Sequence, residues 1–218
     1  MGCPLKEERR RLLDRIRDEL GDLNVIQAMQ KVDRANFVPP SSVHLAYEDI
    51  PLPIGDNQTI SQPFMVALMI GALDLRASDR VLEVGTGSGY QAAVLARLAR
   101  EVVTVERIPS LAESADNRLK TLGVDNVRVH LVGEELGWPD GAPFDTVVVS
   151  AGAPTLPRKL IDQLVVGGRM VAPVGSMGSQ ELMRVVRTAD GFSVRTLGSC
   201  RFVPLIGPDA WPDGTMVD

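Results

Sequence analysis

Three glycines at alternate positions form the segment of this sequence whose residue types and spacing are most typical of a binding site. Gly85, Gly87 and Gly89 follow an apolar stretch, residues 80–84, and precede a stretch with helical periodicity. Glycines at such a strand-to-helix turn allow a tight bend and a close approach of the backbone to a ligand. The spacing differs from the Gly-x-Gly-x-x-Gly dinucleotide fingerprint, from a Walker loop and from the hydrolase nucleophile elbow.

An acidic residue downstream narrows the class of ligand. Glu106 ends the next apolar stretch, residues 102–106, roughly 20 residues after the glycines, as in nucleotide-binding α/β folds. Its carboxylate can accept hydrogen bonds from both hydroxyls of a ribose. The glycine loop and this acid together predict an adenosine-type ligand. With Glu83 at its start, the loop resembles the first motif of class I methyltransferases, which bind S-adenosyl-L-methionine and release S-adenosyl-L-homocysteine.

Apolar and amphipathic stretches alternate along the chain and indicate the elements that position this loop. Strands are expected at residues 80–84, 102–106, 127–132, 146–149 and 169–174, and helices at 63–74, 90–99, 111–122 and 156–164. Such alternation predicts βαβ units and a parallel sheet. A hairpin at Asp190-Gly191 adds antiparallel strands at residues 181–187 and 193–197. The predicted fold class is α/β: a doubly wound, Rossmann-like methyltransferase sheet, mostly parallel with antiparallel C-terminal strands.

The chain upstream of the sheet predicts helices and a long loop. Residues 5–20 form an expected amphipathic helix that ends at Gly21, and residues 25–32 form a second one. Residues 43–63 are expected to be loop with brief structure, and a loop of that length is more often functional than idle. We therefore expect an N-terminal helical extension with a substrate-side loop over residues 1–62. Residues 63–218 would form the S-adenosylmethionine-binding methyltransferase domain, and both would belong to a single compact unit.

Composition limits the partners and the compartment. The 218 residues carry a formal net charge of -5, which argues weakly against nucleic acid, and no apolar run reaches the ~20 residues of a membrane helix. Cys3 and Cys200 form no disulfide framework, so we expect free thiols in a reducing compartment. His44 and His130 are too few and too far apart in sequence to suggest a metal site. We expect a cytoplasmic monomer with no metal, no nucleic-acid partner and no membrane partner.

A more specific resemblance begins upstream of the glycine loop. Residues 45–55 read LAYEDIPLPIG, and residues 58–63 read QTISQP. These segments are similar to those of protein-L-isoaspartate (D-aspartate) O-methyltransferases. The same holds for residues 81–91, 137–139, 143–145, 151–154, 167–169 and 201–205. The resemblance runs from about residue 10 to Gly207, and the TISQP segment is its most diagnostic part.

The resemblance implies protein repair. The family transfers a methyl group to the free carboxylate of an isoaspartyl residue, so the partners would be isoaspartyl-containing peptides and aged proteins. Ser61 matches the family's active-site serine, and Thr59 and Ile60 match its cofactor-side segment. The other expected cofactor-binding residues are Glu83, Gly85, Thr86, Gly87, Ser88, Gly89, Glu106 and Glu134. The resemblance also implies a C-terminal strand arrangement that departs from that of other class I methyltransferases.

The implied chemistry asks little of the side chains. An isoaspartyl carboxyl group with a pKa of about 4 is already ionised at neutral pH, so no general base is needed. Catalysis then consists mainly of alignment and exclusion of water. Ser61 would hydrogen-bond the acceptor carboxylate or order the loop around it, without acting as a nucleophile. A purely structural role for Ser61 is an N-cap of the helix that follows Pro63.

Two departures from the family pattern leave alternatives open. Glu134-Glu135 stands where the family has a Gly-Asp-Gly-like turn, and Ile206 stands where it commonly has Thr. One alternative is a related carboxylate methyltransferase that acts on a dedicated peptide or a small molecule. Another is a cofactor-binding protein that senses or scaffolds without transferring methyl groups. The glycine spacing disfavours a third, a NAD-linked oxidoreductase.

Overall fold

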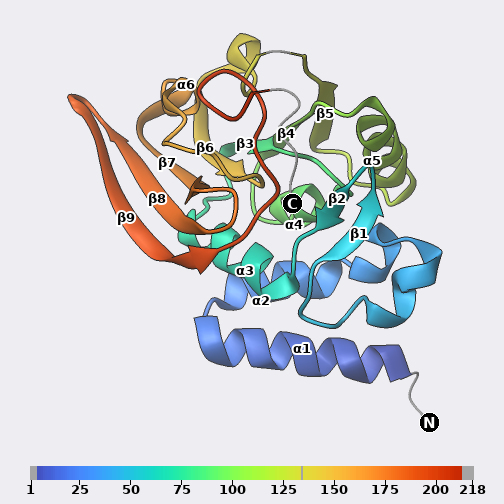
Figure 1. The fold of residues 1–218 in the computed structure, drawn as a ribbon. Helices are drawn as coiled ribbons and strands as arrows, with labels where there is room; N and C mark the ends of the chain where they lie inside the picture. Colours follow the sequence, from blue (N-terminus) through green and yellow to red (C-terminus); the bar gives the residue numbers. More distant parts are fainter. Residues whose placement is uncertain (1–3, 134, 213–218) are drawn as a thin grey trace.

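A seven-stranded sheet forms the centre of the protein, in a computed structural model that describes residues 4–133 and 135–212 (Figure 1). Its strands, in the spatial order β5-β4-β3-β6-β7-β8-β9, are β3 (Arg80–Val84), β4 (Glu101–Glu106), β5 (Val127–Leu131), β6 (Phe144–Val149), β7 (Leu164–Gly175), β8 (Gln180–Thr188) and β9 (Gly191–Cys200). The first five of these in spatial order run parallel, whereas β8 and β9 are antiparallel. The strand order reverses between β3 and β6, and open α/β sheets bind ligands beside such a switch point.

Helices cover both faces of this sheet, because successive strand residues point to opposite sides. The helices that follow the sheet strands or precede them are α3 (Pro63–Ala72), α4 (Tyr90–Leu95), α5 (Pro109–Thr121) and α6 (Arg158–Ile161). Val81 of β3 belongs to a buried cluster with Val66 of α3 and Leu95 of α4. Its neighbour Leu82 belongs to a second cluster with Leu160 of α6. The predicted doubly wound fold is confirmed, and so are its antiparallel C-terminal strands.

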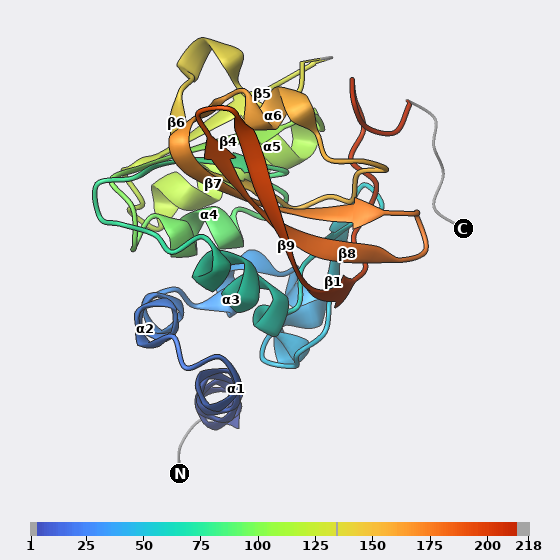
Figure 2. The ribbon, with the colours of Figure 1, turned by 90° about the vertical axis from the view of Figure 1, so that its left-hand side faces the viewer.

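The N-terminal segment packs on the α3 side of the sheet. It consists of α1 (Pro4–Leu20), α2 (Leu23–Lys31), two short 3-10 helices, η1 (Arg34–Phe37) and η2 (Pro40–Leu45), and the hairpin strands β1 (Leu52–Gly55) and β2 (Gln58–Ile60). Figure 2 shows α1, α2 and α3 in succession at one side of the sheet. Ile16 of α1 and Met29 of α2 share one buried cluster with Ile70 of α3. This shared core fits a single compact unit, and the division at residues 62 and 63 stays a prediction.

Some elements are shorter than the sequence predicts. The helix expected over residues 90–99 ends at Leu95, and its last turn tightens, with the Leu98 N–H donating to the Leu95 carbonyl over 2.9 Å. The helix expected over residues 156–164 is reduced to α6, because Leu164 already pairs with Phe144 in the sheet. Residues 43–63 contain the brief structure expected of them, the end of η2 and the β1–β2 hairpin. No described helix has the length and apolar character needed to cross a membrane.

Candidate active site

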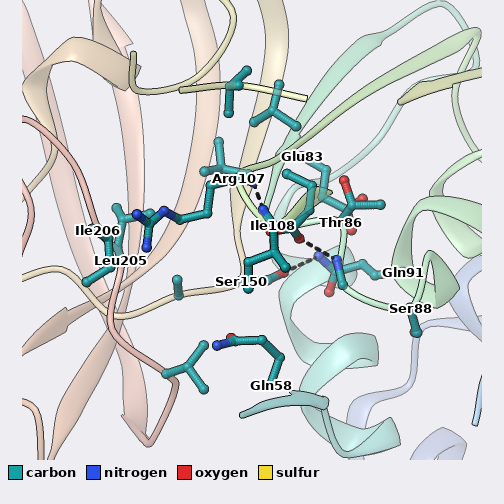
Figure 3. Close-up of a pocket in the computed structure, with 18 of the residues that line it drawn as sticks. Gln58, Glu83, Thr86, Ser88, Gln91, Arg107, Ile108, Ser150, Leu205 and Ile206 are labelled. Carbon is teal, nitrogen blue, oxygen red and sulfur yellow. Dashed lines mark hydrogen bonds between the residues drawn. The ribbon is translucent and has the colours of Figure 1, made fainter. Parts of the chain in front are cut away.

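A cavity of about 450 Å³ lies at the switch point of the sheet, beside the carboxyl ends of β3, β4 and β6. Its volume is in the usual range for sites that hold small molecules. Figure 3 shows the glycine-loop residues on one side of this space and Leu205 and Ile206 on another. Predicted site residues in its lining are Thr59, Ile60, Ser61, Glu83, Gly85, Thr86, Gly87, Ser88 and Glu106.

The glycine loop has the backbone geometry that its sequence predicts. Gly85, Gly87 and Gly89 have φ values of 95°, 52° and 86°, in the left-handed region that favours glycine. The Gly85 N–H donates to the Val105 carbonyl of β4 over 2.9 Å, which ties the loop to the sheet. A Cβ atom on Gly87 would lie 3.4 Å from the Ile54 side chain of the β1–β2 hairpin. A side chain at this position would therefore point towards the hairpin.

Glu106 organises the loop from the end of β4. Its side chain is 6% exposed, and one carboxylate oxygen accepts the Gly87 N–H over 2.9 Å. The other oxygen accepts the N–H groups of Arg107 and Ile108 over 2.9 and 3.1 Å. A carboxylate offers about four acceptor directions, so it retains room for a further donor from a ligand. Glu106 thus lines the cavity and also shapes the loop.

Glu83 is fully buried under the loop and lacks a partner for one oxygen. Its Oε2 atom accepts the Thr104 hydroxyl over 2.6 Å, and Thr104 in turn pairs with the Thr86 hydroxyl at 2.7 Å. Its Oε1 atom has no hydrogen-bond partner among the described residues. Burial raises the pKa of the Glu83 carboxyl from 4.5 to about 8, although the Thr104 hydroxyl and the nearby Gln91 amide oppose this. A cationic group in the cavity would satisfy the free oxygen and favour the ionised form.

Ser88 connects the loop to the helices on either side. Its hydroxyl accepts the Tyr90 N–H over 3.3 Å, at the start of α4. Its carbonyl accepts a hydrogen bond of 2.8 Å from Nη1 of Arg118, on α5. Ser88 lines the cavity, but its hydroxyl is already bonded to the first N–H group of α4.

A second wall of the cavity comes from the segment before α3. The N-cap residue of α3 is Gln62, and the Phe64 N–H donates to the Asp49 carboxylate over 2.8 Å, so the N-cap role for Ser61 is wrong. The Ser61 hydroxyl has no hydrogen-bond partner within the described part of the chain, whereas the Ser61 carbonyl accepts from Arg34 over 3.0 Å. Capping by Asp49 leaves this hydroxyl available at the cavity.

The two departures from the family pattern have different outcomes. Glu134 lies outside the described residues, while Glu135 lines the cavity. Ile206 lies in the lining beside Leu205, as expected from its place in the sequence. Figure 3 shows the Arg107 side chain extending from the end of β4 towards these two residues. The C-terminal segment therefore closes the cavity with apolar side chains at the position of Ile206.

Several residues of the site were not identified from the sequence. Gln91 and Ser150 line the cavity and bond to each other, with Nε2 of Gln91 donating to the Ser150 hydroxyl over 2.9 Å (Figure 3). A signal existed for Ser150, because it follows β6 directly and ligands gather at the carboxyl ends of parallel strands. Gln163 lies outside this lining but supports residues 136–138, because it accepts the Trp138 N–H over 2.8 Å and donates to the Leu136 carbonyl over 2.9 Å. No sequence pattern links Gln163 to the loop that it supports.

Comparison with known proteins identifies the family. The model of the protein-L-isoaspartate(D-aspartate) O-methyltransferase family matches residues 7–210. The chain is 51% identical to a protein-L-isoaspartate O-methyltransferase of Syntrophotalea carbinolica over 197 residues, which cover 90% of this chain and 91% of that protein. It is 48% identical to one of Methanoculleus marisnigri over 210 residues, which cover 95% and 96% of the two chains.

Solved structures agree with this fold. A protein-L-isoaspartate O-methyltransferase superposes with a TM-score of 0.80 at 28% identity, over 92% of this chain and 66% of that one. A putative protein-L-isoaspartate O-methyltransferase from Plasmodium falciparum, in complex with S-adenosyl-L-homocysteine, gives a TM-score of 0.77 at 24% identity, over 89% and 96% of the two chains, and shows the shared fold. This protein belongs to the protein-L-isoaspartate(D-aspartate) O-methyltransferase family, whose members use S-adenosyl-L-methionine.

Proposed function

We propose that this protein is a protein-L-isoaspartate O-methyltransferase that acts on isoaspartyl residues in damaged peptides and proteins. The observation that carries the proposal is the cavity shared by two walls. One wall is a glycine loop with its acidic partners, and the other presents the Ser61 hydroxyl, for which no described residue provides a hydrogen bond. The family and its relatives supply the reaction, which esterifies the free carboxylate of an isoaspartyl residue.

The residues of the first wall fit S-adenosyl-L-methionine. The unpartnered Oε1 atom of buried Glu83 suits the ammonium group of the methionine part. Glu106, at the end of β4, suits the ribose hydroxyls. A Cβ atom on Gly85 would lie 3.5 Å from Ser150 in the cavity lining, so the glycine leaves space there, whereas Gly89 faces Ala115 and Leu119 of α5 outside the lining. When bound, the cofactor supplies a methyl group already activated by its sulfonium, so the protein needs no residue to activate the donor.

The second wall suits the acceptor. We assign to Ser61 a hydrogen bond to the isoaspartyl carboxylate, which orients one oxygen of that group towards the donor side. Ile60, which is 4% exposed, and Leu205, which is 5% exposed, place apolar surface around this point and exclude water. Thr59 and Ile60, which the resemblance assigns to the cofactor side, belong to the same segment and line the cavity beside Ser61. Because the acceptor is ionised at neutral pH, its alignment by Ser61 is the main task left to this wall.

We further propose that the enzyme works in the cytoplasm as a monomer. Cys200 carries a free thiol, which suits a reducing compartment. Cys3 lies outside the described residues. Size-exclusion chromatography with light scattering would measure the oligomeric state directly.

Methyl transfer to a matched peptide pair tests the proposed function. One peptide contains isoaspartate and the other contains aspartate at the same position, and both are incubated with radiolabelled S-adenosyl-L-methionine. We expect base-labile methylation of the isoaspartyl peptide alone. We also expect S61A to lower kcat/KM by about tenfold, as the loss of one hydrogen bond to a charged group would do. Equal methylation of both peptides, or of neither, would refute the assignment of substrate.

A further inference from the structure

Arg34 is a buried arginine that gathers three backbone carbonyls of the substrate-side segment. It is 2% exposed and lies at the start of η1. Nη1 donates to the Ala46 carbonyl over 2.7 Å, and Nη2 donates to the carbonyls of Ile50 and Ser61 over 3.2 and 3.0 Å. One guanidinium thus joins two points of the loop that precedes β1 to the residue that we place at the acceptor carboxylate.

The Arg34 guanidinium is a buried positive charge without an ion pair to any residue that the structure describes. No carboxylate forms an ion pair with Arg34 among the described residues, and its Nε atom has no hydrogen-bond partner there. Burial lowers the pKa of the Arg34 guanidinium, because the charged form loses its hydration. A side chain such as Met would fill the same space at a lower desolvation cost. The protein therefore keeps a side chain with a high desolvation cost at this position. The geometric effect of that side chain is to fix the backbone of Ser61.

The turn that carries Arg34 is itself fixed on both sides. The Asp33 carboxylate accepts the Ala35 N–H over 3.0 Å and also the Tyr47 hydroxyl. Tyr47 follows Ala46, so residues 33 and 34 hold two adjacent residues of the loop. On the other side, Phe37 packs edge-to-face against Tyr90, with ring centroids 5.5 Å apart. Tyr90 is the first residue of α4, directly after the glycine loop.

These contacts form a continuous mechanical connection between the two walls of the cavity. It runs from the end of the glycine loop through Tyr90 and Phe37 to η1, and through Arg34 to Ser61. We propose, on the basis of the proposed function, that Arg34 is a positioning residue for the methyl transfer. It sets the distance and orientation of Ser61 relative to the wall formed by the glycine loop, Glu83 and Glu106, called the cofactor wall below. It does not contact the substrate.

Steady-state kinetics of R34K test this proposal, with R169K as a matched control. Arg169 is also buried, at 8% exposed, and also donates to backbone carbonyls, those of Leu73 and Asp74, but it differs from Arg34 in its ion pair with Asp79 and lies outside the cavity lining. We expect R34K to lower kcat/KM for the isoaspartyl peptide by about tenfold, because small misplacements of reacting groups are costly. The Kd for S-adenosyl-L-homocysteine should stay within about twofold, and R169K should lower the Tm but keep kcat/KM within about twofold.

A double-mutant cycle separates positioning from a general structural effect. If Arg34 acts through Ser61, R34K in the S61A background should lower kcat/KM by less than about threefold. A full additional loss in that background, or a Kd for S-adenosyl-L-homocysteine that weakens as much as kcat/KM, would overturn the proposal. If R34K does not fold, the kinetics of Y47F test the proposal instead. This substitution removes the hydrogen bond between the Tyr47 hydroxyl and Asp33 without disturbing the buried charge of Arg34.

We expect Y47F to lower kcat/KM by about threefold with an unchanged Kd for S-adenosyl-L-homocysteine. An unchanged kcat/KM in Y47F would then count against the proposal. The methylation activity of the wild-type protein distinguishes failure of the proposed function from failure of the role assigned to Arg34. Absence of methylation by wild type would refute the proposed function. An active wild type together with an unaffected R34K, or with an unaffected Y47F where R34K does not fold, would refute the role of Arg34 alone.

Discussion

The two walls of the cavity are built by different means. The cofactor wall is continuous with the sheet, because the glycine loop bonds to Val105 and Glu106 at the end of β4. The substrate wall, residues 46–61, contains only the short β1–β2 hairpin. Side chains distant in the sequence hold it, with Arg34 bound to its carbonyls and its own Asp49 bound to α3.

This difference has a consequence for function. The geometry of the cofactor wall follows from the sheet and changes little unless the sheet changes. The substrate wall depends on a few contacts between side chains and backbone, so single substitutions can alter its geometry without affecting cofactor binding. Variants that weaken one wall and leave the other intact therefore test the comparison.

The largest effect is expected from a side chain in the glycine loop. G87V would strain a residue with φ of 52° and place Cβ 3.4 Å from Ile54. We expect the Kd for S-adenosyl-L-homocysteine, measured by calorimetry, to rise by at least about 100-fold, because a β-branched residue is strained at this φ and its methyl groups extend beyond Cβ towards the hairpin. G123V is the control, since Gly123 also has a positive φ, 66°, but a Cβ atom there would meet no atom within 4 Å beyond its chain neighbours. Equal losses of affinity in both variants would show that backbone strain alone matters.

The buried acid under the loop should make the cofactor-free protein sensitive to pH. The pKa of Glu83 is raised in the folded state to about 8 from 4.5, so its contribution to stability is complete below pH 4.5 and is lost as pH rises towards 8. We expect the free energy of unfolding of wild type, relative to E83Q, to fall steadily over this interval. Urea denaturation at several pH values measures it.

The exposed Glu113 of α5 provides the control for net charge. E113Q should keep the pH dependence of wild type. If wild type and E83Q show parallel curves of stability against pH, Glu83 is not the titrating group. A cofactor that supplies a cation to Glu83 should also bind with release of a proton below about pH 8, which calorimetry in two buffers would detect.

A smaller effect is expected where a single side chain supports the cofactor wall. R118M removes the hydrogen bond from α5 to the Ser88 carbonyl. We expect the Kd for S-adenosyl-L-homocysteine to rise by about threefold to tenfold, as one lost hydrogen bond would produce, while KM for the peptide stays unchanged. This is the reverse of the pattern expected for R34K. S114A removes only the other contact of Arg118 and should leave both constants unchanged. A raised peptide KM in R118M would show that a change in the glycine loop reaches Ser61 through the contact between Tyr90 and Phe37.

The sequence alone determined the sheet and the cofactor wall. The alternation of strand and helix periods, the three glycines and Glu106 are local patterns whose geometry follows from neighbouring residues. They predicted the fold class and the place of the cavity. The sequence also singled out Ser61, which lines the cavity, but by resemblance to a family and not by any local pattern. The ends of α4 and α6 could not be predicted, because tertiary pairing and a tightened last turn set them.

Only the tertiary structure decided how Ser61 is presented. Its expected alternative role as a helix cap is filled by Asp49, which lies earlier in the chain and reaches the start of α3 through space. Arg34 and Ser61 are separated by 27 residues and meet through a guanidinium and a carbonyl. Such contacts leave no periodic signal, because any residue offers the carbonyl and only the folded path of the chain brings the donor to it. The geometry of the substrate wall therefore depends on the tertiary structure, whereas that of the cofactor wall follows from residues that are close in the sequence.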